Sequence, residues 1–150
     1  MDPEKIALRQ MILALILIGI VGLIAELLLL KHFDSWTQVI PLATLGAGLA
    51  TTIIAARNPT RRALRAFTIV MTLFVLAGVL GLVLHFKGNI EWALERTPEL
   101  RGTALIWKAL TGATPALAPG ALAQLGLLGL AWSYRHPGVR SHFEHMEIDE

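Results

Sequence analysis

Two histidines and one acid are the residues whose types and positions could do chemistry in this chain of 150 residues. His32 and His85 each precede a phenylalanine at the end of a long apolar run, and Glu26 lies inside the first run. Neutral imidazoles are good metal ligands, and two of them can bind a haem iron axially. A charged side chain at the depth of a bilayer usually faces a partner or a water-filled cavity.

Each of these residues has more than one interpretation. The histidine pair could bind haem, or Glu26, Asp34 and Glu91 could join a non-haem metal site instead. The same histidines could simply lie at helix C-termini, where a cation is mildly favourable. Glu26 could handle protons or contact a ligand, or it could hydrogen-bond to a neighbouring helix near the membrane surface.

The composition excludes several classes of protein. Hydrophobic residues make up 55% of the chain and charged residues 16%, which is too apolar for a soluble domain of this size with its large surface. The absence of cysteine excludes disulfides and thiolate chemistry, and a net charge of +2 without a large basic block does not favour nucleic-acid binding. Neither a nucleophile–base arrangement nor a glycine-rich phosphate loop is recognisable, so the sequence does not indicate an enzyme.

Four apolar runs are long enough to cross a membrane as helices. A span needs about 20 mostly apolar residues, and continuous rather than alternating apolar runs favour helices over barrel strands. The runs cover residues 11–30, 36–56, 66–86 and 115–134. We therefore predict an all-α membrane protein in which a single domain forms a bundle of four transmembrane helices.

The distribution of lysine and arginine predicts the orientation of this bundle, because short cytoplasmic loops carry an excess of both. One side carries Lys5, Arg9, Arg57, Arg61, Arg62, Arg65, Arg135 and Arg140, and the other carries the smaller set Lys31, Lys87, Arg96, Arg101 and Lys108. Both termini, including the tail of residues 135–150, are therefore expected in the cytoplasm. Residues 87–114 form the outer loop.

The outer loop has features of two short helices. Asn89 can cap a helix over residues 90–96, and a second helix is expected over residues 103–110. Trp92 and Trp107 suit the headgroup region of a membrane. We expect this amphipathic loop to lie on the outer membrane surface.

The two halves of the chain resemble each other. Pro41 and Arg57 are separated from Pro119 and Arg135 by the same number of residues, and the first and third apolar runs both end in His-Phe. This pattern indicates a duplicated helical hairpin with a pseudo-twofold axis along the membrane normal, although shared composition could also produce it.

Prolines and small residues predict how the spans are built. Proline fits best in a first helical turn, so Pro41 and Pro119 are candidate helix-breaking residues. If regular helix begins at these prolines, the second and fourth spans are shortened. Such spans can mark a binding site or thin the bilayer locally. Helices in lipid associate through small residues, and the candidate packing positions are Gly19, Gly22, Gly46, Gly78, Gly81, Gly126 and Gly129.

Residues 85–137 contain Gly88-Asn89-x-Glu91, Trp107-x-Ala109-Leu110-x-Gly112, Leu117-Ala118-Pro119-Gly120, Leu125-Gly126-Leu127-Leu128-Gly129-Leu130 and Arg135-His136-Pro137. This segment resembles an uncharacterised group of small bacterial four-span membrane proteins. The resemblance implies a location in a bacterial inner membrane, and it transfers no activity.

The function that the sequence favours is that of a non-catalytic membrane scaffold or accessory subunit. Such a protein would pack with itself or with a larger membrane complex, and it would contact lipid but no nucleic acid. One alternative is an electron-transfer protein that binds haem or a metal through His32 and His85. Another is a small transporter with Glu26 in its pathway.

Overall fold

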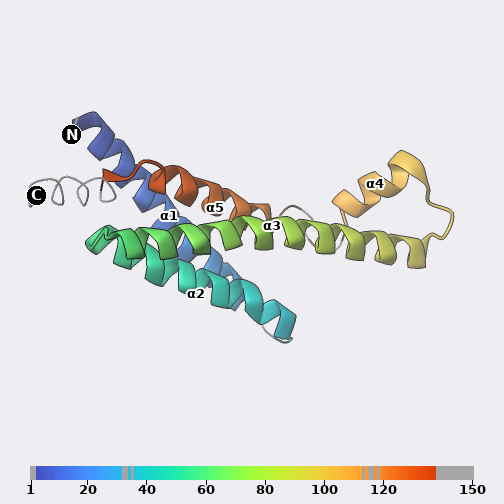
Figure 1. Ribbon diagram of the computed structural model, residues 1–150. Helices are drawn as coiled ribbons and strands as arrows, with labels where there is room; N and C mark the ends of the chain where they lie inside the picture. The colour runs from blue at the N-terminus through green and yellow to red at the C-terminus, as the bar shows by residue number, and fades with distance from the viewer. Residues whose placement is uncertain are drawn as a thin grey trace, which may run out of the picture. The chain divides into compact units, whose positions relative to one another are not determined.

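The chain is helical throughout most of its length in the computed structural model, which describes residues 3–31, 34, 36–112, 114, 117 and 119–137. The helices are α1 (Pro3–Leu29), α2 (Trp36–Arg57), α3 (Arg61–Arg96), α4 (Gly102–Leu110) and α5 (Gly120–Ser133) (Figure 1). The predicted all-α fold is confirmed. Helices α1, α2 and α3 are long and apolar enough to cross a membrane, whereas α5 is an apolar helix of 14 residues.

The surface of α1 shows which medium suits these helices. Only Ile16 and Ile20 are buried in α1, whereas Ile18 is 69% exposed and Leu29 is 83% exposed. A helix that is apolar on all sides belongs in the core of a large protein or in a membrane. Most of α1 therefore needs lipid or another apolar partner to cover it.

The chain forms two compact units. The bundle unit consists of Met1–Phe74 and Leu125–Glu150, and the hairpin unit consists of Val75–Gln124. Helices α3 and α5 each contribute residues to both units. In the bundle unit, α1 and α2 pack against each other (Figure 1).

Large side chains of α3 pack against glycines in the bundle unit. Phe67, Met71 and Phe74 are fully buried and lie on one face of α3, at the spacing of neighbouring helical turns. A Cβ atom at Gly48 of α2 would overlap the ring of Phe74, and one at Gly129 of α5 would overlap Met71. Contacts between a large and a small residue let helices approach closely without a hydrophobic driving force.

The predicted packing glycines fall into two groups. Gly19, Gly78, Gly81 and Gly129 are in close contact with another segment, and Gly126 is buried. Gly22 and Gly46 instead face open space, so they do not mediate helix packing within the described part of the chain. Glycine content indicates that an apolar helix can pack closely, but it does not show which face does so.

The two prolines occupy different positions. Helix α2 begins at Trp36, in agreement with the predicted span of residues 36–56, and it continues through Pro41, so Pro41 does not break the helix. The missing N–H of Pro41 leaves only one carbonyl without a bond, close to the helix end, which limits the cost. Pro119 does directly precede its helix, and its carbonyl accepts hydrogen bonds from the backbone N–H groups of Leu122 (3.1 Å) and Ala123 (3.4 Å).

Helix α3 is longer than predicted. It continues past Phe86 to Arg96, so the predictions of a separate helix over residues 90–96 and of a cap at Asn89 are wrong. Gly88 alone does not interrupt the helix, because it costs only about 1 kcal/mol relative to alanine and good helix formers follow it. The helix ends before Pro98, as expected from the sequence, and α4 lies close to the predicted range of residues 103–110.

Replacing Gly78 by alanine is expected to destabilise the protein by about 1–3 kcal/mol, the usual cost of overpacking. The added Cβ would lie 2.6 Å from the backbone nitrogen of Ala123 and 2.9 Å from the carbonyl oxygen of Pro119, and backbone atoms cannot rotate away. The measurement is thermal unfolding in mild detergent. Gly88→Ala, in the same helix but with nothing within 4 Å, is the control and should be neutral or stabilising. Equal melting temperatures for the two variants would contradict this packing.

Candidate functional site

A buried asparagine holds the end of α3 to the segment that follows α4. The side chain of Asn89 is 2% exposed, and its amide nitrogen donates hydrogen bonds to the carbonyls of Ala109 (2.8 Å) and Thr114 (2.7 Å). Its amide oxygen accepts from the backbone N–H (3.2 Å) and the hydroxyl (2.7 Å) of Thr114. Both donors and both acceptor positions of the amide are therefore used. Asn89 fixes the α3–α4 hairpin, defined here as residues 87–112.

Two further features shape the α3–α4 hairpin. A Cβ atom at Gly112 would overlap the amide of Asn89, so the chain can pass this close only with glycine there. At the opposite end, the Arg101 guanidinium donates to the carbonyls of Pro98 (2.5 Å) and Leu100 (2.7 Å), and Gly102 has a φ of +57°, which glycine adopts readily. Particular residues therefore fix both the turn between α3 and α4 and the close approach of the chain after α4 to α3.

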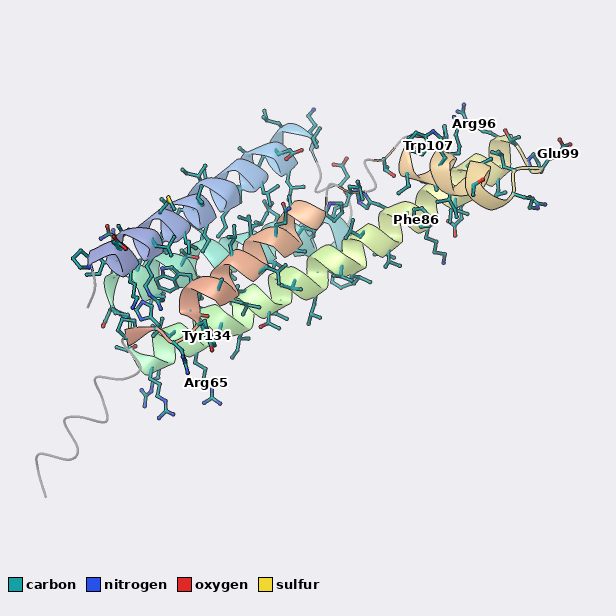
Figure 2. All side chains as sticks on the ribbon, turned by 90° about the horizontal axis from the view of Figure 1, so that it is seen from above. Arg65, Phe86, Arg96, Glu99, Trp107 and Tyr134 are labelled. Atoms are coloured by element: carbon teal, nitrogen blue, oxygen red, sulfur yellow. The ribbon has the colours of Figure 1, made fainter. Side chains whose placement is uncertain are left out.

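The surface of the α3–α4 hairpin carries aromatic side chains beside basic ones. The guanidinium of Arg96 lies 4.4 Å from the centre of the Trp92 ring, and the Lys108 ammonium lies 6.0 Å from it. Such cation–π contacts are worth about 0.5–1 kcal/mol at exposed sites. Trp107 and Ile106 are 68% and 52% exposed on α4. Figure 2 shows Arg96, Glu99 and Trp107 at this end of the hairpin unit.

The residues that the sequence singled out for chemistry are divided between the two units, with Glu26 and Asp34 in the bundle unit and His85 and Glu91 in the hairpin unit. His32 lies outside the described residues, and His85 is half-buried in α3. Glu26 and Asp34 are exposed, and the carboxylate of Glu91 lies 3.7 Å from the Lys87 ammonium. No group of three or more metal-ligating side chains occurs among the described residues.

A second polar contact, in the bundle unit, was not predicted. The guanidinium of Arg9 in α1 donates hydrogen bonds to the carbonyls of Trp132, Tyr134 (3.0 Å) and Arg135 (3.3 Å) at the end of α5. The last carbonyls of a helix have no partner within it and carry partial negative charge, so a cation there is favourable. The sequence indicated only that Arg9 lies on the basic side. Every residue has a backbone carbonyl, so the sequence does not show which carbonyls Arg9 contacts.

An aromatic cluster lies beside this contact. The rings of Phe67 and Trp132 meet edge to face at 5.1 Å, and the His136 imidazole lies 4.7 Å from the Trp132 ring. Burial, and secondarily the positive charge of Arg9, lowers the pKa of His136 below its usual 6.5. His136 is therefore held in its neutral form near pH 7.

Comparisons with known protein families, with curated proteins and with solved structures find no match for this chain. The resemblance of residues 85–137 to small bacterial four-span proteins accordingly stays a prediction.

Replacing Asn89 by alanine is expected to free α4 from α3. The carbonyl of Ala109 and the polar groups of Thr114 would lose their partners, and each buried group left unpaired costs about 1–3 kcal/mol. Hydrogen–deuterium exchange in detergent should rise in residues 102–112 and stay unchanged in α1 and α2. Asn58→Ala, at an exposed position, is the control. Unchanged exchange in the Asn89 variant would show that the amide does not hold the hairpin.

The stability of the protein is expected to fall in mild acid because of His136. Its pKa is lowered in the folded state, so below about pH 6.5 the unfolded chain binds more protons than the folded one. The stabilisation is complete above about pH 6.5 and is lost as the pH falls toward the folded-state pKa. Melting temperatures in detergent between about pH 7.5 and pH 5 should drop more steeply for the wild type than for His136→Gln. Parallel curves for the wild type and His136→Gln would rule out this contribution.

Proposed function

We propose that the chain is a non-catalytic integral membrane scaffold or accessory subunit that binds another subunit through the α3–α4 hairpin. The observation that carries this proposal is the continuity of α3 beyond its apolar stretch, with α4 held against the extension by Asn89.

The length of α3 exceeds what a membrane needs. The helix has 36 residues and is about 54 Å long at 1.5 Å per residue. Residues 66–86 contain no lysine, arginine or carboxylate and cover about 31 Å, close to the hydrocarbon thickness of about 30 Å. The next ten residues extend the helix by about 15 Å. They include the charged residues Lys87, Glu91, Glu95 and Arg96. From an unbroken helix of this length we infer that the hairpin extends beyond the membrane rather than lying flat on its surface.

The surface of the hairpin suits a protein partner. Tryptophan and arginine are the residues that most often dominate binding between proteins, and Trp107 and Arg96 are both exposed on this hairpin. The bonds of Asn89 fix the hairpin before binding, so less conformational freedom is lost when a partner arrives. The partner could be another membrane subunit or a second copy of this chain.

Helix α5 is proposed as a fourth span. Its 14 residues cover about 21 Å, which is less than a full crossing, and a locally thinner bilayer accommodates such a mismatch. Arg9 supplies hydrogen bonds to the carbonyls at its end, which lipid cannot do. With four spans and the excess of basic residues on one side, both termini lie in the cytoplasm of a bacterial cell, and the chain lies in the inner membrane.

The other functions stay predictions of the sequence. They are electron transfer through haem at His32 and His85, and transport past Glu26. A duplicated hairpin also stays a prediction. The first helices of its two halves, α1 and α3, end at different positions relative to the repeat. Helix α1 ends at Leu29, whereas α3 continues well beyond His85.

The test is photo-crosslinking in living cells of the native host. A benzophenone amino acid replaces Trp107, or replaces Leu76 as the control on the exposed apolar surface of α3. We expect a discrete protein adduct only from position 107, whereas position 76 should react mainly with lipid. An adduct of twice the mass of the chain would identify a second copy as the partner. A lack of any protein adduct from position 107 would refute the proposal.

A further inference from the structure

Basic side chains gather at one end of the bundle unit. They come from the start of α1, the end of α2, the start of α3 and the residues after α5: Lys5, Arg9, Arg57, Arg61, Arg62, Arg65 and Arg135. We call this set the basic end. The hydrogen bond from Arg9 to the Trp132 carbonyl joins α1 to α5, and the contact of Phe67 with Trp132 joins α3 to α5. Figure 2 shows Arg65 and Tyr134 at this same end.

Three cations of the basic end are available to a ligand. Arg57, Arg62 and Arg65 are exposed, and their guanidinium groups have no acidic partner in the part of the chain that the structure describes. Arg9 differs, because its guanidinium is already bonded to carbonyls of α5.

The surroundings of these arginines indicate what kind of ligand they meet. Arg57 follows Ile53 and Ile54, which are 37% and 55% exposed on α2. Arg65 precedes Ile69, which is 55% exposed on α3. A cation next to an exposed apolar helix surface lies at headgroup level when lipid covers that surface. A nucleic acid or an acidic peptide would leave the adjacent apolar side chains uncovered.

We propose that the basic end binds the headgroups of anionic phospholipids, with Arg57, Arg62 and Arg65 as the main contacts. Guanidinium groups bind phosphate through two parallel hydrogen bonds, which suits arginine better than lysine. Each basic residue near an anionic surface is expected to raise the affinity about fivefold. The proposal requires a membrane location, but it does not require that the α3–α4 hairpin has a partner.

The test uses the full chain in a neutral detergent, with bound lipid counted by native mass spectrometry. Phosphatidylglycerol and phosphatidylcholine are offered at equal concentrations, and the wild type should bind phosphatidylglycerol preferentially. The variant Arg57→Gln, Arg62→Gln and Arg65→Gln should bind phosphatidylglycerol about 100-fold more weakly. The control Lys87→Gln, Arg96→Gln and Lys108→Gln removes the same charge from the hairpin unit and should keep the preference.

Three results would overturn the proposal. They are equal binding of both lipids by the wild type, equal losses in the two triple variants, and displacement of phosphatidylglycerol by inorganic phosphate at similar concentration. The last result would identify a site for free phosphate. Circular dichroism checks folding, and the three single glutamine variants replace the triple if it does not fold. Each single variant is expected to lose about fivefold in affinity. Because the lipid measurement does not involve a protein partner, its failure would leave the crosslinking result at position 107 unaffected.

Discussion

Polar groups in the apolar part of this chain need partners within the protein, because lipid offers none. Among the described residues, no buried side-chain nitrogen or oxygen lacks a hydrogen-bond partner. The threonines meet this need locally, since the hydroxyls of Thr52 and Thr68 donate to carbonyls one turn earlier in their own helices. Arg9 and Asn89 meet it over long distances in the sequence, and these two residues determine where helix ends are held.

Close packing between large side chains and glycines is a second constraint on the structure. Within the bundle unit, α3 presents Phe67, Met71 and Phe74, and glycines of α2 and α5 leave the space for two of them. Burying an aliphatic chain gains little when the alternative is lipid, so close contact matters more than apolar area. Helix α3 also continues beyond its apolar stretch, and this extension supports α4. One element thus takes part in both the packing of the bundle unit and the presentation of the hairpin.

Much of the helical content could be predicted from the sequence, because it follows from long apolar runs and from the residues that end helices. Pro98 ends α3, and the apolar periodicity of residues 103–110 anticipated α4. The errors involve information that the local sequence lacks. Asn89 resembles a helix cap until its partners, Ala109 and Thr114, are known. A Cβ atom at Gly22 or Gly46 would contact nothing within 4 Å, and the sequence does not show which glycines meet a neighbouring helix. The contacts of Arg9 join the two ends of the chain, and no local pattern encodes them.

The bond between Arg9 and the end of α5 has a consequence for biosynthesis. The donor is made before its acceptors, which lie 125 and 126 residues further along the chain, so the contact cannot form until the end of α5 has left the ribosome. Helices α1, α2 and α3 are long enough to be inserted as they emerge, but α5 is short. The hydrogen bonds from Arg9 therefore hold the end of this short helix to α1. A product that lacks Arg9 would lose the hydrogen bonds that hold the end of α5 to α1.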